Sequence, residues 1–155
     1  MQIKGYFRSG VRPLPAPFVQ AEVYLPRLAV RGYVDFLIDT GADRTVLHSC
    51  NTIVLGIDFR RLRRSTLEEM SGVGGSSKYY REDVQLTFID EDGNLHRFSS
   101  QIYLAQKSNP NTSPPSLLGR DILNLCSVSI NRQSGEISIS PIMAERPEAQ
   151  PRLLP

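Results

Sequence analysis

The chain has 155 residues, enough for one domain of ordinary size with a modest hydrophobic core. With 40% hydrophobic and 22% charged residues, it has the composition of a globular protein and not of a disordered chain. Its formal net charge of +2 gives no electrostatic argument for a nucleic-acid partner, and no apolar run approaches the ~20 residues that a membrane-spanning helix needs.

The sequence carries no signal of a secreted, redox-active or metal-binding protein. Its N-terminus lacks the apolar segment of a signal peptide, so we expect a cytoplasmic location. Cys50 and Cys126 show no metal or redox spacing, and we expect both to be reduced and in or near the core. His48 and His96 have no Cys, His or carboxylate at ligand spacing, so we assign both to structure and expect neither a metal nor a cofactor.

The N-terminal quarter is predicted to form short strands. Residues 3–8 fit an edge strand, and the prolines within residues 12–17 exclude a central strand there. Apolar and polar residues alternate over 19–25, the pattern of a half-buried strand. A turn over residues 26–29 then leads to a second strand over 30–38.

This second strand, whose end is apolar, runs directly into Asp39-Thr40-Gly41-Ala42, and the β-branched pair Thr45-Val46 follows. A carboxylate at the end of a buried strand is costly to keep there, because desolvation opposes its charge. An Asp in an isolated Asp-Thr-Gly often does no more than cap a turn. Such a turn residue does not need apolar strands on both sides, so the flanks favour a functional carboxylate at Asp39.

Residues 47–55 are predicted to be helical. Gly56 follows as the stop signal. The expected apolar face consists of Leu47, Cys50, Ile53 and Val54.

Residues 58–64 form the strongest charge cluster, with four arginines around Phe59 and Leu62. One interpretation is a patch that binds phosphate or acidic groups. The other is a solvated face whose Phe59 and Leu62 pack on the core, and we favour it because such runs are usually solvated surface and Glu68 and Glu69 follow closely. The arginines are Arg60, Arg61, Arg63 and Arg64.

Three glycines, Gly72, Gly74 and Gly75, surround Val73 in a segment that can bend freely. Their spacing matches neither G-x-G-x-x-G nor a P-loop, so a phosphate cradle is not indicated. Residues 78–81 regain strand propensity, which favours the tip of a hairpin. Such a tip could fold over a ligand.

The second half reads as two further hairpins separated by a loop. Asp-Gly within residues 90–94 is a strong hairpin signal, and residues 107–116 are a loop by composition. The expected elements are a hairpin over 84–104, a short strand Leu117-Leu118, Gly119, a helical turn through Leu125, and a closing hairpin over 128–140.

With these elements in place, the chain resembles the retroviral-type (retropepsin-like) aspartic proteases, as a cellular member. Three elements match in order: the apolar-Asp-Thr-Gly-Ala-Asp-x-Thr-Val-Leu stretch at 36–47, a Gly-rich hairpin at 72–75, and apolar-apolar-Gly-Arg-Asp at 117–121. The resemblance covers residues 18–140. It implies a mainly β, small closed β-barrel-like acid-protease fold with one or two short helices. We divide the chain into an N-terminal arm (1–17), the protease domain (18–141) and a Pro-rich tail expected to be disordered (142–155).

The resemblance also implies an activity. It predicts an endopeptidase that hydrolyses peptide bonds of extended polypeptides with water activated by two aspartates. The sequence holds one Asp-Thr-Gly and therefore half a site, so a catalytic pair needs a homodimer. We expect polypeptide substrates and no nucleic-acid or membrane partner.

The roles that the resemblance implies follow the motif positions. Asp39 would be the catalytic residue, supported by Thr40, Gly41 and Ala42. Asp43 and the flap would bind substrate. Asp43 would also pair with Arg120, and Arg120 and Gly119 would have a structural role near the dimer interface. The flap residues are Gly72, Val73, Gly74 and Gly75, and Val46, Val73 and Leu118 are candidate pocket walls.

Three departures and three alternatives accompany this hypothesis. Arg44 replaces a small or acidic residue, the segment 50–67 is longer than in compact viral enzymes, and the termini match nothing of the interleaved viral dimer sheet. The alternatives are a catalytically silent interaction module of the same fold, a nucleic-acid binder acting through residues 60–64, and a sugar-kinase or actin-like ATPase. The last needs a far longer chain with two lobes.

Overall fold

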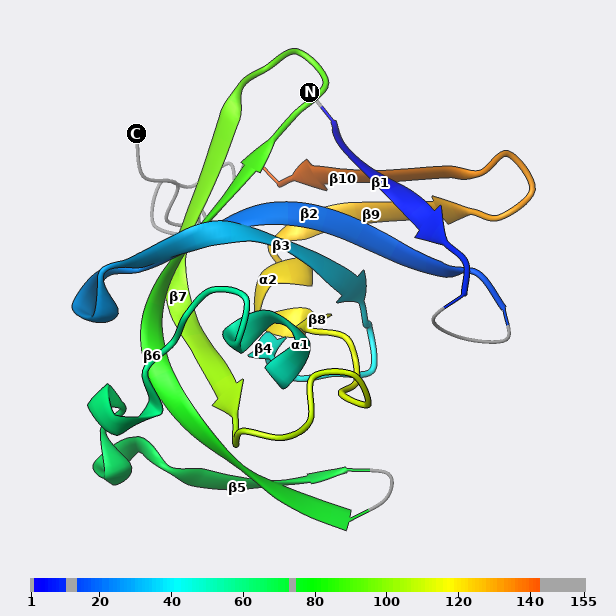
Figure 1. Ribbon diagram of the computed structural model, residues 1–155. Coiled ribbons are helices and arrows are strands. Elements are labelled where there is room, and N and C mark those ends of the chain that lie inside the picture. The colour runs from blue at the N-terminus through cyan, green and yellow to red at the C-terminus, as the bar shows by residue number, and fades with distance from the viewer. Residues whose placement is uncertain (1, 11–13, 73–74, 143–155) are drawn as a thin grey trace.

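The computed structural model describes residues 2–10, 14–72 and 75–142 and shows a mainly β protein (Figure 1). Within these described ranges, two short α-helices and three 3-10 turns join the strands. The strands are β1 (Ile3–Arg8), β2 (Ala16–Leu25), β3 (Val30–Ile38), β4 (Val46–Leu47), β5 (Glu68–Gly72), β6 (Gly75–Ile89), β7 (Leu95–Ala105), β8 (Leu117–Leu118), β9 (Cys126–Asn131) and β10 (Glu136–Pro141). The helices are α1 (Ser49–Thr52) and α2 (Arg120–Leu123), and the 3-10 turns are η1 (Pro26–Leu28), η2 (Phe59–Arg61) and η3 (Arg64–Thr66).

The strands form one sheet in the order β5-β6-β7-β4-β8-β3-β2-β1-β10-β9. An additional pairing between β2 and β6 joins the two ends of its central part into a ring. Most pairs are antiparallel, but β8 runs parallel to β3 and β4 runs parallel to β7. These parallel pairs lie in the middle of the sheet, where the chain returns from distant segments.

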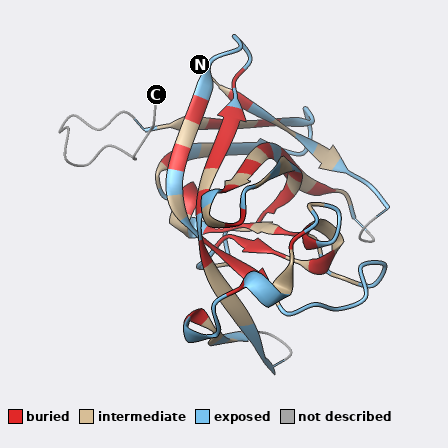
Figure 2. Cartoon of the chain, turned by 60° about the vertical axis from the view of Figure 1, so that its left-hand side comes forward, coloured by how far each residue is buried: buried red, intermediate tan, exposed pale blue. Residues whose placement is uncertain are grey.

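The hydrophobic core lies inside this ring. Residues that alternate with polar neighbours along β2, β6 and β7 point inward, as Figure 2 shows by the red bands along the strands. Phe36, Leu47, Leu86 and Leu104 are fully buried there. The period-2 pattern of the sequence thus marks the buried face correctly. In the part of the chain that the structure describes, no helix has the length and apolar character to span a membrane.

The two N-terminal predictions have different outcomes. The edge-strand prediction for β1 is wrong, because residues 3–5 pair with β10 and residues 6–8 pair with β2. Pro17 belongs to β2 and lies opposite Phe7, but β3 pairs with β2 only from Phe18 onward. The prolines therefore stay out of a strand that is paired on both sides, as expected, because proline lacks the N–H that a second neighbour would need.

The predicted helix over 47–55 is also mostly wrong. Leu47 belongs to β4 and pairs with Leu104, and α1 covers only Ser49–Thr52. Val54 is 82% exposed, so the expected apolar face does not exist as such. Pairing with β7 overrides the local helical period, a common outcome because propensity is a weak signal. Gly56 does end this segment, with φ of 72°.

The long hairpin β6–β7 is confirmed, and its turn holds a polar cluster that the sequence did not reveal. His96 Nε2 lies 2.8 Å from Asp90 Oδ2, and the backbone N–H groups of Asp92 and Asn94 each donate to Asp90 Oδ1 at 2.9 Å. The hydrogen bond from His96 is the main reason why the pKa of Asp90 falls well below its usual range. His96 is therefore structural as predicted, but it has a carboxylate partner.

The arginine-rich segment 58–64 packs on the core through its two apolar residues, and two of its arginines have partners in the chain. Leu62 is buried and Phe59 packs against the core, while Arg60 is exposed and pairs with Asp58. Arg61 donates to the backbone carbonyls of Leu28 and Arg27, at 3.1 Å each. The expected packing of Phe59 and Leu62 on the core is confirmed by these contacts.

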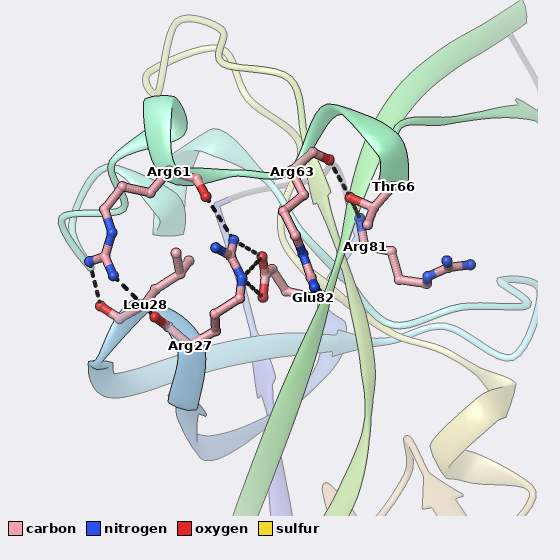
Figure 3. A network of polar contacts seen from close by, with 7 residues as sticks. All are labelled: Arg27, Leu28, Arg61, Arg63, Thr66, Arg81 and Glu82. Carbon is pink, nitrogen blue, oxygen red and sulfur yellow. Dashed lines mark hydrogen bonds and ion pairs between the residues drawn. The ribbon is translucent and has the colours of Figure 1, made fainter.

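An ion pair with a buried carboxylate links this segment to the middle of β6 (Figure 3). The Glu82 side chain is 1% exposed, and Arg27 Nε donates to both of its carboxylate oxygens, at 2.9 and 3.2 Å. Arg27 Nη2 also donates to the Arg61 carbonyl at 2.8 Å. Arg27 and Arg61 therefore clamp η1 to η2, and Glu82 fixes both to β6.

Cys50 and Cys126 are both free thiols, as predicted. Cys126 is buried, and burial raises the pKa of its thiol to about 11. Cys50 is half-buried at the start of α1.

Candidate active site

Asp39 stands where β3 leaves the sheet. Its backbone N–H donates to the Leu118 carbonyl at 3.1 Å, and the N–H of Leu37 donates to Ser116 at 2.9 Å. These bonds extend the parallel pairing of β3 with β8 up to the carboxylate. The chain then turns back on itself, because the Ala42 N–H donates to the Asp39 carbonyl at 3.2 Å. The apolar strand before Asp39 thus acts as a rigid base for this residue.

The Asp39 side chain is half-buried and oriented by its own loop. Its Oδ1 accepts a hydrogen bond from the Gly41 N–H at 2.9 Å. A Cβ at Gly41 would lie 3.3 Å from the same oxygen, so glycine leaves room for the carboxylate. Thr40, Gly41 and Asp43 are exposed in the single chain. The loop thus presents its carboxylate at a surface.

The segment that follows β8 supports this loop from the other side. The Arg120 N–H donates to the Ala42 carbonyl at 2.8 Å, and the Arg120 guanidinium contacts the Asp43 carboxylate. The Asp43–Arg120 pair that the resemblance implies is thus present. The Arg120 side chain is 46% exposed and that of Asp43 is 76% exposed in the single chain, so this surface ion pair adds little stability by itself.

A second set of contacts, between Thr45 and Asp121, was not predicted. Asp121 accepts from the Thr45 hydroxyl at 2.7 Å and from the Thr45 N–H at 3.0 Å. The Thr45 hydroxyl in turn accepts from the Gly119 N–H at 3.1 Å. Thr45 is 1% exposed, so these bonds satisfy polar groups that would otherwise be buried without partners. The two residues are 76 positions apart, and no local pattern links them.

Gly119 is required by close packing of two backbones. A Cβ at this position would lie 2.5 Å from the carbonyl carbon and oxygen of Arg44 and 2.9 Å from its nitrogen. The Asp39 loop and the turn before α2 can therefore approach each other only when residue 119 has no side chain.

We expect Gly119→Ala to destabilise the protein by about 1–3 kcal/mol and to lower any activity of the Asp39 loop, because backbone must move to admit the methyl group. Urea unfolding measures the stability. The matched control is Gly32→Ala, whose Cβ would meet only the end of the Leu55 side chain, also at 2.5 Å. A flexible side chain can rotate away, so equal losses in the two variants would contradict the backbone argument.

The Gly-rich hairpin is formed by β5 and β6, with Gly72 opposite Gly75 at its end. Gly75 has φ of 114°, which only glycine adopts easily. Val73 and Gly74 lie outside the described residues. A hollow of about 560 Å³ lies alongside the hairpin, lined by His48, Glu69, Lys78, Tyr79, Gln106 and Pro114 among others.

The His48 ring closes one side of this hollow. Its Nδ1 lies 2.8 Å from the Pro115 carbonyl, and the ring meets Tyr79 edge-on with centroids 6.4 Å apart. Burial lowers the pKa of His48. His48 is thus a packed, structural residue, as the sequence predicts.

Two of the expected pocket walls do not line any surface of the single chain. Val46 is 4% exposed and Leu118 is fully buried, because both belong to strands in the centre of the sheet. Their sequence neighbours in the motifs suggested contact with substrate, but the strand pairing turns both inward. This prediction is wrong for Val46 and Leu118, and Val73 lies outside the described residues.

The comparisons with known proteins agree with this arrangement. A crystal structure of a retropepsin-like aspartic protease from Rickettsia conorii is similar, with a TM-score of 0.55, 13% sequence identity and 90% of each chain covered. At that identity the likeness shows the fold. No curated protein matches the sequence. The family profile described as retroviral aspartyl protease matches residues 15–131, which includes the Asp39 loop, the β5–β6 hairpin and the Gly119 turn. The chain therefore belongs to the retroviral aspartyl protease family.

Proposed function

We propose that this protein is an aspartic endopeptidase whose active site forms between two copies of the chain. The observation that carries the proposal is the Asp39 loop. It holds one oriented carboxylate at an exposed surface, on a rigid strand end, in a chain with one Asp-Thr-Gly. Two such loops facing each other across a two-fold axis would make one complete site.

In the proposed dimer, the two Asp39 carboxyl groups lie in contact and share one proton, because two negative charges so close together repel each other strongly. The ionised carboxylate takes a proton from a water molecule, which attacks the carbonyl carbon of the peptide bond. The protonated carboxyl gives its proton to the carbonyl oxygen. Collapse of the tetrahedral intermediate then breaks the C–N bond. The leaving nitrogen takes the proton that the first carboxylate removed from water, and the second carboxylate takes a hydroxyl proton from the intermediate, which restores one shared proton.

The surrounding residues would bind an extended peptide. Gly41, Ala42 and Asp43 follow the carboxylate on the exposed loop, and the β5–β6 hairpin would lie over the substrate as a flap. Backbone groups on both sides can then pair with the peptide as with an added strand. Thr40, exposed in the single chain, would hydrogen-bond across the axis and hold the two loops together.

The direct test is digestion of a diverse peptide library with the purified chain. We expect internal cleavage, inhibition by a pepstatin-type transition-state analogue, and no effect of a chelator. Cleavage that a chelator abolishes, or none with a folded dimeric chain, would refute the proposal. The second result would instead favour a silent interaction module of the same fold.

We expect the specific activity to fall on dilution, because the proposed site disappears when the dimer dissociates. Cleavage of one good library peptide is measured over a series of chain concentrations, with sedimentation at the same concentrations. Activity per chain should follow the dimer fraction. A chain that is monomeric at every concentration and still cleaves would contradict the shared site.

A further inference from the structure

The surface that joins the two chains can be located from the strand pairing, an inference that rests on the proposed function because the site needs a second copy. The terminal strands of the described chain already pair with each other. β10 pairs with β1 on one side and with β9 on the other, so no strand of a second chain can enter between them.

Within residues 2–10, 14–72 and 75–142, β9 pairs on one side only. The Ile142 N–H donates to the Leu125 carbonyl at 3.0 Å, so these two residues are a hydrogen-bonded pair of the β9–β10 ladder. In an antiparallel ladder every second residue bonds to its partner. Ser127, Ser129 and Asn131 therefore bond inward to β10. The N–H and C=O groups of Cys126, Val128 and Ile130 point outward, where the described chain supplies them no partner.

The side chains of this edge also favour contact with an identical strand. β9 carries no charged residue, so two copies do not repel each other. It also has no proline and no bulge to block pairing, the usual protections of an exposed edge. Val128 packs against the core, and Ile130 on the same face is 44% exposed and continues this apolar surface outward.

β9 also lies close to the incomplete site. It follows α2 directly, and α2 begins at Arg120, which bonds the Asp39 loop through Ala42 and Asp43. α2 contacts β9, and β8 pairs with the end of β3, directly before the Asp39 loop (Figure 1). A two-fold axis at the edge of β9 therefore places the two supporting turns, and with them the two loops, near the axis.

We propose that two copies of the chain pair antiparallel through the outer edges of their β9 strands, in the register centred on Val128. Two identical strands related by a two-fold axis pair antiparallel by necessity. This register places Val128 opposite its own copy and Cys126 opposite Ile130, so it uses every outward-pointing group. The result is one continuous sheet in the order β1-β10-β9-β9-β10-β1 across the dimer.

The register gives a charge-swap test. It places Ser127 of one chain opposite Ser129 of the other, and both side chains are exposed in the single chain. The repulsive variant is Ser127→Lys with Ser129→Lys, which creates two facing like-charge pairs. The matched variant is Ser127→Lys with Ser129→Glu, which creates two attractive pairs at the same positions. Both are made in the Asp39→Asn background, so that self-digestion does not interfere, and thermal unfolding checks that each folds.

Sedimentation equilibrium should show a dimer for the parent chain. We expect the Lys/Lys variant to raise the dimer dissociation constant roughly tenfold or more, and the Lys/Glu variant to remain close to the parent. A Lys/Lys variant that dimerises like the parent would overturn the surface. A Lys/Glu variant as weak as Lys/Lys would overturn the Val128-centred register.

Peptide cleavage by the same variants with Asp39 intact separates this inference from the proposed function. Activity should follow the dimer fraction and return for Lys/Lys at high chain concentration. A chain that dimerises as described but cleaves no peptide would refute the endopeptidase and leave the surface standing. A chain that cleaves peptides but whose dimer dissociation constant is unchanged in both variants would refute the surface and leave the endopeptidase standing.

Discussion

Replacing Asp39 by asparagine is expected to lower peptide cleavage by roughly 10²–10⁴-fold or more, the range that a single acid–base group contributes. An amide can neither accept the proton of the attacking water nor give one to the carbonyl oxygen. In a dimer the change removes both carboxylates of the site at once, so we expect the upper part of this range. The measurement is the initial rate on one library peptide, wild type beside variant, at a concentration where both are dimeric.

The fold should survive this substitution. Asp39 contributes one acceptor, Oδ1, to the Gly41 N–H, and the asparagine side chain retains an oxygen for that bond. The unfolding free energy should therefore change little. The matched control is Asp83→Asn on β6, whose exposed carboxylate accepts from Gln101 and lies outside the loop. Full activity in Asp39→Asn, or an equal loss in Asp83→Asn, would refute the catalytic role.

The elements that carry these predictions were visible in the sequence because their signals are local. Alternating residues marked β2, an apolar run into Asp-Thr-Gly marked the end of β3, and Asp-Gly marked the turn between β6 and β7. Each signal needs only a few consecutive residues, since the period of a strand and the chemistry of a turn are properties of short segments. The order of the three motifs along the chain then indicated the family.

What the sequence did not reveal depends on residues far apart in the chain. Leu47 followed a helical period locally, but pairing with Leu104 placed it in β4. Asp121 reads as an ordinary helix-start residue until the fold brings Thr45 beside it. β1 reads as an edge strand because its partner β10 lies at the other end of the chain. In each case the deciding partner is specified by topology, which no window of sequence contains.

The burial of Glu82 could not be predicted from the sequence for the same reason. Its charge suggests an exposed position on β6, but its side chain is buried against Arg27. We expect Arg27→Met to destabilise the protein by about 3–5 kcal/mol, the usual cost of leaving one partner of a buried pair without the other. The matched control is Arg31→Met. Arg31 pairs with Glu22 at 2.6 Å, with its own side chain 54% exposed, and the loss of such a surface pair costs about 0–1 kcal/mol.

A double-mutant cycle separates lost attraction from a stranded charge. Adding Glu82→Leu to Arg27→Met removes the buried carboxylate, so most of the lost stability should return. The Arg61 carbonyl still loses its donor, which leaves a smaller deficit. Urea unfolding of the four chains gives the coupling free energy. If the double variant is as unstable as Arg27→Met, the cost arises from unclamping η1 and η2 and not from the charge. If the stability recovers, the role of Arg27 is to neutralise the buried Glu82 carboxylate. The ion pair then holds β6 in place next to the proposed flap.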